Sequence, residues 1–186
     1  MRIFLLVIFS FCSVMKIEAQ QSYADSLQHE FLYAKEDSTK TMALYRLAWY
    51  YSLLYPDSAL YYADKLIQFS SQENYLPAKV LGYICKGEAL DRVASYPEAL
   101  EAAFQGLELA KTLPAHRTFA TGRAYSLIGH VYNMTGNDKE AVGYFHSALG
   151  LLEASHEYAE DLCLARFSMS FSMLNTGNKD SAMYYV

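Results

Sequence analysis

The chain is poor in the residues that interrupt helices. Only 4 prolines and 9 glycines occur among 186 residues, whereas hydrophobic residues make up 53%. This balance favours helix over β-structure or disorder, and it leaves enough apolar side chains for a sizeable core. Basic residues are also scarce, with 15 Lys and Arg against 20 Asp and Glu and a net charge of −5. Because no cluster of Lys or Arg is present, a nucleic-acid-binding surface is disfavoured.

Motifs that carry catalysis or hold cofactors are absent from the sequence as well. It has no glycine-rich phosphate loop, no CxxC pair and no HExxH. His156 and Glu160 share one helical face, but a metal site needs at least one more ligand, so a solvated helix start is the better interpretation. Cys85 and Cys163 are interpreted as two small buried side chains. We therefore expect a protein that is not an enzyme and binds no metal or cofactor.

Residues 1–19 have the pattern of a secretory signal peptide. Arg2 gives a positive start, residues 3–15 are mostly apolar, and Ala19 stands where a signal peptidase would cleave. The apolar run is shorter than the roughly 20 residues that span a bilayer as a helix. Cleavage is therefore favoured over the alternative of an uncleaved membrane anchor, and we expect export from the cytoplasm.

One short block returns four times along the rest of the chain. Its clearest copies are DSALYY at 57–62 and DSAMYY at 180–185, and related blocks lie at 97–102 and 139–144. The alanines of the four copies are spaced 40, 42 and 41 residues apart. A fixed period in this range indicates a solenoid of repeated helical units.

Each period divides into two amphipathic helices. In the third unit, apolar residues recur at helical spacing over 120–134 and again over 139–154, with Gly136 in the turn between them. A separate amphipathic segment over 20–36 predicts a helix that covers the apolar end of the first unit. The four predicted units are about 38–72, 75–111, 115–154 and 157–186, and the last of them is incomplete.

The third unit resembles a tetratricopeptide repeat position by position. The residues that match the pattern of that family are Tyr125, Ile128, Gly129, Tyr132, Gly136, Ala141, Phe145 and Ala148. The resemblance covers about residues 38–186 and implies an all-α fold, a right-handed α-α superhelix of about four helical hairpins with an extra N-terminal helix. The period is longer than the 34 residues of the best-known repeats. It is similar to that of kinesin light chains and of many bacterial sensory and regulatory proteins.

The resemblance also implies a concave groove, lined by the first helix of each unit, in which a protein or peptide binds. The candidate groove residues counted from Gly87 and Gly129 are Leu81, Ile84, Glu88, Asp91, Arg123, Ser126, His130 and Asn133. The fourth unit adds Phe167, Phe171 and Leu174. Solvated surface is an equal alternative for the polar members, and packing between repeats is a stronger alternative for Phe167 and Phe171. The lysine-rich clamp with two asparagines that binds acidic peptide tails is not found, which disfavours a cytosolic chaperone adaptor.

The last copy of the block is followed by few residues. Only four follow Ala182, whereas the matching helix of the third unit continues for at least ten residues past Ala141. We therefore expect an unfinished array. The resemblance implies the periplasmic sensor part of a larger bacterial signalling protein, such as a histidine kinase or a transcription regulator, tethered to the membrane through a missing C-terminal part. The alternative is a free-standing periplasmic or envelope-associated scaffold.

Overall fold

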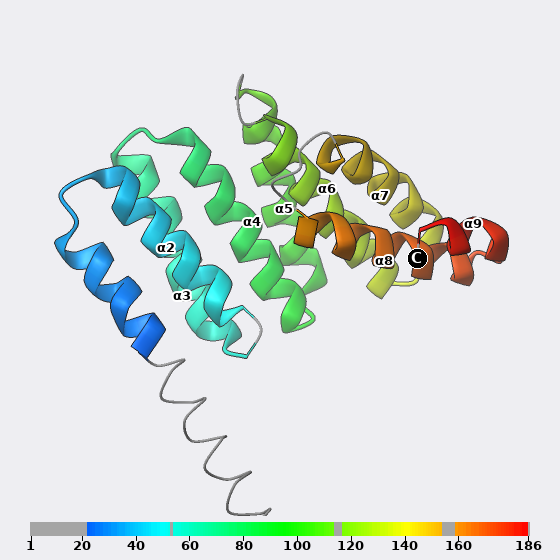
Figure 1. The fold of residues 1–186 in the computed structure, drawn as a ribbon, viewed down its shortest axis with the longest axis horizontal. Coiled ribbons are helices and arrows are strands. Elements are labelled where there is room, and N and C mark those ends of the chain that lie inside the picture. The colour runs from blue at the N-terminus through cyan, green and yellow to red at the C-terminus, as the bar shows by residue number, and fades with distance from the viewer. Residues whose placement is uncertain (1–21, 53, 114–116, 154–158, 186) are drawn as a thin grey trace, which may run out of the picture.

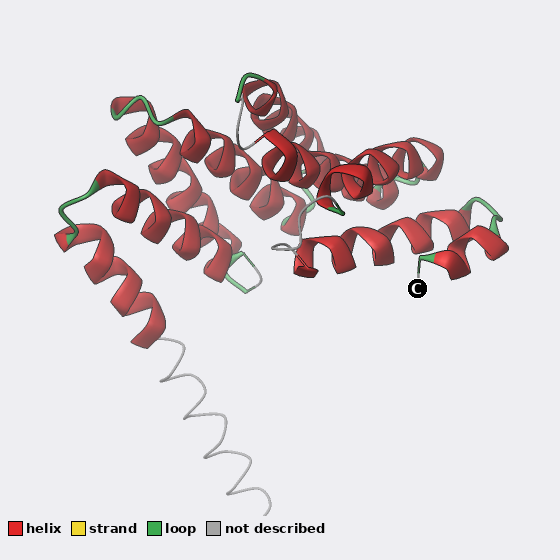
Figure 2. Ribbon diagram, turned by 45° about the horizontal axis from the view of Figure 1, so that its top comes forward, coloured by secondary structure: helices red, strands yellow, loops and turns green. Residues whose placement is uncertain are grey.

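Helices follow one another along the chain in the computed structural model (Figures 1 and 2). The structure describes residues 22–52, 54–113, 117–153 and 159–185, and within these ranges there is no strand. A first helix covers residues 22–33. The helices that follow are α2 (Asp37–Tyr51), α3 (Pro56–Gln72), α4 (Leu76–Arg92), α5 (Tyr96–Lys111), α6 (Arg117–Met134), α7 (Asp138–Leu152), α8 (Ala159–Asn175) and α9 (Lys179–Tyr184).

Neighbouring helices pack in pairs, and the pairs stack into an array (Figure 1). α2 pairs with α3, α4 with α5, α6 with α7 and α8 with α9, and each pair also packs on the next one. This arrangement confirms the predicted all-α superhelix of helical hairpins.

The four repeated alanines are buried at the start of the second helix of each pair. Their exposed fractions are 0% for Ala59, Ala99 and Ala141 and 1% for Ala182. A Cβ atom added to Gly87 of α4 would lie 3.1 Å from the carbonyl oxygen of Ala99. Because protein interiors are close-packed, these small residues determine how near the two helices of a pair approach.

Four of the turns share one backbone conformation. The residue with positive φ is Asn74 (57°), Ala94 (57°), Gly136 (78°) or Gly177 (84°). The following residue donates its N–H to the carbonyl five residues earlier, as Asn137 does to Tyr132 at 2.8 Å. This is the hydrogen bond of a Schellman motif, which ends a helix sharply. A separate feature is proline, which stands within the first two positions of α3, α4 and α5, where a missing N–H costs little.

The array is tighter on one side than on the other. The first helices of the pairs contact one another, α2 with α4, α4 with α6 and α6 with α8. In the described ranges no second helix contacts another second helix. The array therefore curves around its first helices, and we call the surface formed by α2, α4, α6 and α8 the inner face.

The helix over residues 22–33 lies against the first pair. Ala24 and Leu27 are buried together with Leu47 of α2. The rings of Phe31 and Phe69 of α3 pack edge to face, with their centroids 6.1 Å apart. The residues of this helix thus cover apolar side chains at that end of the array.

No helix within the described ranges is both long and apolar enough to cross a membrane. The predicted signal peptide, residues 1–19, lies outside these ranges.

Gly136 and Gly143 provide a matched pair of substitutions. Gly136 has a φ of 78°, whereas Gly143 lies inside α7 with no atom within 4 Å of an added Cβ. We expect Gly136→Ala to lower the free energy of unfolding by about 1 kcal/mol, because alanine is strained at positive φ. Gly143→Ala is expected to raise it by about 0.5–1 kcal/mol. Urea denaturation followed by circular dichroism measures both changes, and effects of the same sign would contradict the turn described here.

Candidate functional site

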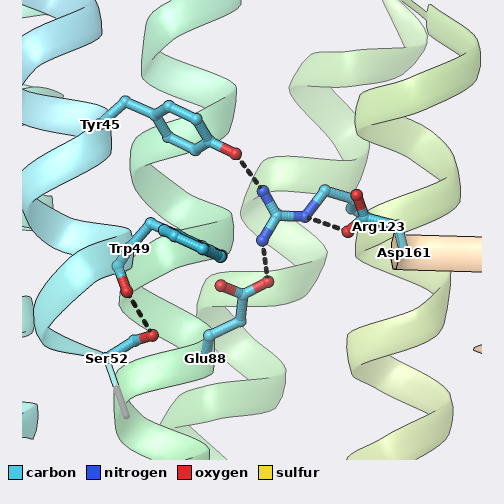
Figure 3. A network of polar contacts seen from close by, with 6 residues as sticks. All are labelled: Tyr45, Trp49, Ser52, Glu88, Arg123 and Asp161. Carbon is cyan, nitrogen blue, oxygen red and sulfur yellow. Dashed lines mark hydrogen bonds and ion pairs between the residues drawn. The ribbon is translucent and has the colours of Figure 1, made fainter. Parts of the chain in front are cut away.

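Arg123 of α6 lies at the centre of the inner face and binds side chains from three other helices (Figure 3). Its guanidinium donates a hydrogen bond of 2.6 Å to the Tyr45 hydroxyl of α2 and another to the Glu88 carboxylate of α4. Its Nε lies 3.2 Å from Oδ1 of Asp161 on α8. One side chain therefore joins all four first helices, and we call these four residues the Arg123 network.

The Arg123 network holds a buried charge, since only 6% of the Arg123 side chain is exposed. Burial by itself lowers the pKa of the guanidinium, but Glu88, Tyr45, Cys85 and Asp161 outweigh it and hold the pKa well above its usual value. Burial also raises the pKa of Tyr45 to about 12, although Arg123 opposes this shift. At neutral pH the network therefore contains a charged arginine and a neutral tyrosine hydroxyl.

A second polar pair lies on the inner face. Nδ1 of His130 on α6 is 3.0 Å from Oδ2 of Asp91 on α4. The Asp91 side chain is only 9% exposed, whereas that of His130 is 42% exposed. The histidine therefore presents part of its ring to the surface while the carboxylate fixes its orientation.

Trp49 is the single tryptophan of the sequence and lies on the same side of α2 as Tyr45, one turn further along. Figure 3 shows its ring pointing towards the Arg123 network. The residue is 44% exposed. The side chains of Glu88 and Asp161 keep 25% and 32% of their surface exposed. The inner face thus offers an aromatic surface, carboxylate edges and an imidazole around a buried guanidinium.

Two pairs of predicted groove residues lie in contact in the structure, and one predicted groove residue is buried in the core instead. Glu88 contacts Arg123, and Asp91 contacts His130, in each case across neighbouring pairs of helices. The prediction that Ile84 faces the groove is wrong, because Ile84 is fully buried in the core between α4, α5 and α6.

The remaining candidates differ in their surroundings. Leu81 is half-buried against a core cluster that includes Leu44 and Leu66, and Ser126 is half-buried. Nδ2 of Asn133 donates to Oδ1 of Asp138 at 2.6 Å and to the Ser172 hydroxyl at 2.9 Å, so it ties the third pair to the fourth. The apolar candidates of α8 are exposed rather than packed between repeats, namely Phe167, Phe171 and Leu174.

Tyr45, Trp49 and Asp161 are inner-face residues that sequence reasoning did not select. The first unit matches the repeat pattern loosely in its first helix, so its register could not be assigned. The signal that was available is the presence of one tryptophan in a chain with 17 tyrosines. Trp and Tyr are the residue types most enriched among strong binding contacts.

The two cysteines differ in their surroundings, and no metal site is found within the described ranges. Cys85 is buried as predicted, and burial, followed by the effect of Glu88, raises the pKa of its thiol to about 12. Cys163 is exposed, so the prediction that it is buried is wrong. In the same part of the chain, no three His, Cys, Asp or Glu side chains lie close enough to hold a metal ion. His156 and the Glu160 side chain fall outside what the structure describes.

Comparisons with known proteins agree with the helical-repeat fold described above. No family model matches the sequence. The Cell division cycle protein 16 homologs of Homo sapiens and Mus musculus are each 37% identical over 71 residues, which are 38% of this chain and 9% of each relative. A Rap protein complexed with Competence and Sporulation Factor superposes with a TM-score of 0.77 at 22% identity, over 92% of this chain and 48% of that one. The chain therefore has a helical-repeat fold of the tetratricopeptide type.

Two further solved structures have the same kind of fold as this tetratricopeptide-type chain. The apo form of RapI has a TM-score of 0.67 at 19% identity and matches 91% of this chain and 60% of its own. BtubC (BKLC) from P. vanneervenii has a TM-score of 0.67 at 16% identity and matches 91% and 69%. At these identities the likeness extends to the fold alone.

Replacing Arg123 tests how much the inner face depends on it. Arg123→Met leaves two carboxylates without their partner in a partly buried site, so we expect the free energy of unfolding to fall by about 3–5 kcal/mol. The matched control is Arg166→Met, because Arg166 pairs with Glu153 on the surface at 2.8 Å and both side chains are about half exposed. Exposed pairs contribute little, so this control is expected to change stability little. Urea denaturation of both variants measures the difference, and equal losses would contradict a central role for Arg123.

Proposed function

We propose that this tetratricopeptide-type array binds a protein or peptide segment along its inner face and has no catalytic role. The observation that carries the proposal is the pair of partly exposed rings, Trp49 and His130, that stand on a face fixed by the Arg123 network. The His130 ring is oriented by Asp91 before binding, so it loses little conformational freedom when a ligand arrives, which favours affinity.

The charges of the inner face suggest the chemistry of the bound segment. The carboxylates of Glu88 and Asp161 pair with the guanidinium of Arg123, and a third carboxylate, that of Asp91, lies beside His130. These three carboxylates outnumber the basic groups beside them, so the balance of charge on this face is negative. A segment that places an apolar side chain on Trp49 and a basic or hydrogen-bond-donating group beside Glu88 or Asp161 is complementary to this surface.

The comparisons supply general support for a binding role. A Rap protein with a similar fold was solved in a complex with Competence and Sporulation Factor. By analogy, we infer that this array also holds a partner.

The binding proposal is tested with the native fluorescence of Trp49. Peptides selected from a random library against the chain are titrated while the tryptophan emission is recorded, because Trp49 is the only tryptophan. We expect binding to shift the emission. In fluorescence anisotropy with labelled peptide, Trp49→Ala is expected to weaken binding by about tenfold or more. The matched control is Tyr61→Ala, an aromatic residue of the second helix α3 that is 58% exposed. An inner-face site would be contradicted if a peptide bound the Tyr61→Ala variant more weakly and the Trp49→Ala variant as tightly as the wild type.

We further propose that the module is exported and forms the sensor part of a larger bacterial signalling protein. The signal-peptide pattern of residues 1–19 supports export, and the long repeat period, similar to that of bacterial sensory proteins, supports the sensor role. A free-standing periplasmic or envelope-associated scaffold is the second candidate, and stoichiometric envelope proteins in a pull-down from an envelope fraction would favour it.

Export has a direct test. When the chain is expressed in a bacterium and recovered from the periplasmic fraction, we expect N-terminal sequencing to begin at Gln20. The Ala19→Trp variant is the control, because a bulky side chain at the cleavage position is expected to leave the precursor uncleaved. A full-length chain found only in the cytoplasm would contradict export.

A further inference from the structure

Asp91 carries a buried carboxylate that the fold leaves partly unpaired. Its side chain is 9% exposed, and one oxygen, Oδ2, lies 3.0 Å from Nδ1 of His130. The other oxygen, Oδ1, is buried and has no hydrogen-bond partner among the described residues. A buried polar atom without a partner lowers the stability of a fold, so its presence calls for a different explanation.

The position of Asp91 along α4 is unfavourable for a carboxylate as well. Asp91 stands one residue before Arg92, the last residue of the helix. The C-terminal end of a helix carries a partial negative charge, which repels a carboxylate in the last turn. Neither burial nor the helix dipole therefore accounts for an aspartate at this point.

The matching position of α6 carries a neutral side chain. Asn133 stands four residues after Gly129, as Asp91 stands four residues after Gly87. The amide of Asn133 donates to Asp138 and to a hydroxyl of the next helix pair, so it joins two pairs without a buried charge. The Asp91 carboxylate instead has one described polar contact, which is the imidazole of His130.

This contact determines which nitrogen of His130 carries a hydrogen. An ionised carboxylate only accepts hydrogen bonds, so Nδ1 is the donor. The neutral ring then has a lone pair on Nε2, which points away from Asp91. The His130 side chain is 42% exposed, and Nε2 has no hydrogen-bond partner among the described residues. The ring thus presents an acceptor on the inner face.

The charged groups around α6 leave His130 to Asp91. The helices that pack against α6 are α4, α5, α7 and α8. Among their described residues, Asp91 is the charged group that contacts His130. Other carboxylates of these helices have described partners of their own, namely Glu88, Glu98, Glu101, Glu108, Asp138 and Asp161. One carboxylate therefore orients the ring.

We propose that His130 is a specificity-determining residue of the inner face and that Asp91 is its positioning residue. Nε2 of His130 accepts a hydrogen bond, so the bound segment must bring an N–H or O–H group to this point. A segment that places a carboxylate or a carbonyl there is rejected, because two acceptors would face each other. This inference rests on the proposed binding function and adds one recognition atom to it.

The first test is the dependence of peptide binding on pH. The peptides are those whose binding shifts the Trp49 emission, with an acetylated N-terminus and no group that titrates between about pH 5 and 8. Protonation of His130 puts a hydrogen on Nε2, which then no longer accepts. We expect the affinity, measured by fluorescence anisotropy, to fall by about tenfold from pH 8 to pH 5.

Two substitutions of His130 separate the acceptor from the ring. The amide oxygen of glutamine can accept near the position of Nε2 and does not titrate, so His130→Gln is expected to bind well, with equal affinity at both pH values. Phenylalanine keeps a ring without an acceptor, so His130→Phe is expected to weaken binding by about tenfold at pH 8. Urea denaturation of both variants checks that they are folded.

Asp91→Asn tests the positioning role and introduces the residue type that α6 has at the matching position. An amide can donate to Nδ1, which leaves the hydrogen on Nε2 and turns the acceptor into a donor. We expect affinity at pH 8 to fall by about tenfold, while the free energy of unfolding does not fall, because a buried charge is removed. The matched control is Asp64→Asn, since Asp64 pairs with Lys86 at the surface of α3. This control is expected to bind like the wild type.

Failure of this inference can be told apart from failure of the binding function. If Trp49→Ala leaves binding unchanged, the inner-face site and the role of His130 are both wrong. If Trp49→Ala weakens binding but His130→Phe binds like the wild type at both pH values, only the role of His130 is wrong. Tighter binding at pH 5 than at pH 8 would show that His130 donates to an acidic group, which also overturns the proposal. An Asp91→Asn variant that loses stability and keeps its affinity would leave Asp91 with a packing role alone.

Discussion

The guanidinium of Arg123 must keep its charge while almost wholly removed from water, and the inner face is organised around that requirement. Removing a charged group from water is costly unless hydrogen bonds and opposite charges compensate it. Here the compensating groups are Tyr45, Glu88 and Asp161, and each comes from a different helix. The positions of α2, α4 and α8 relative to α6 are therefore tied to one side chain.

The curvature of the array depends on how closely its helices approach one another. Where two helices of a pair meet, alanine or glycine allows close approach, as at Gly87 and Ala99. First helices also contact one another along the inner face, whereas the described second helices do not. The close side is thus the side on which α2 and α6, separated by a whole unit, still exchange a hydrogen bond through Tyr45 and Arg123. The exposed rings of Trp49 and His130 lie on this contracted side, which is also the proposed binding face.

Local patterns predicted the fold well, because the repeat unit is a local structure. The alanine period, the helical spacing of apolar residues and the turn glycines all report on contacts within about 40 residues of sequence. The Arg123 network was not predictable in this way. Tyr45 and Arg123 are 78 residues apart, and whether an arginine points to solvent or across two helices depends on the superhelical curvature.

The wrong prediction for Ile84 likewise concerns a contact between helix pairs. Ile84 and Phe167 occupy matching repeat positions, yet Ile84 is fully buried in a core that includes side chains of α6, whereas Phe167 is 70% exposed. A periodic sequence identifies which stripe of a helix a residue belongs to. It does not tell whether a neighbour covers that stripe.

Repeat arrays are usually held together by contacts between adjacent units, so that they come apart unit by unit from the ends. The Arg123 network departs from this scheme, because it links the first, second, third and fourth pairs through one group. Opening either end of the array would expose a buried charge in the middle of it. We therefore expect the four pairs to unfold as one cooperative unit, coupled through a single side chain.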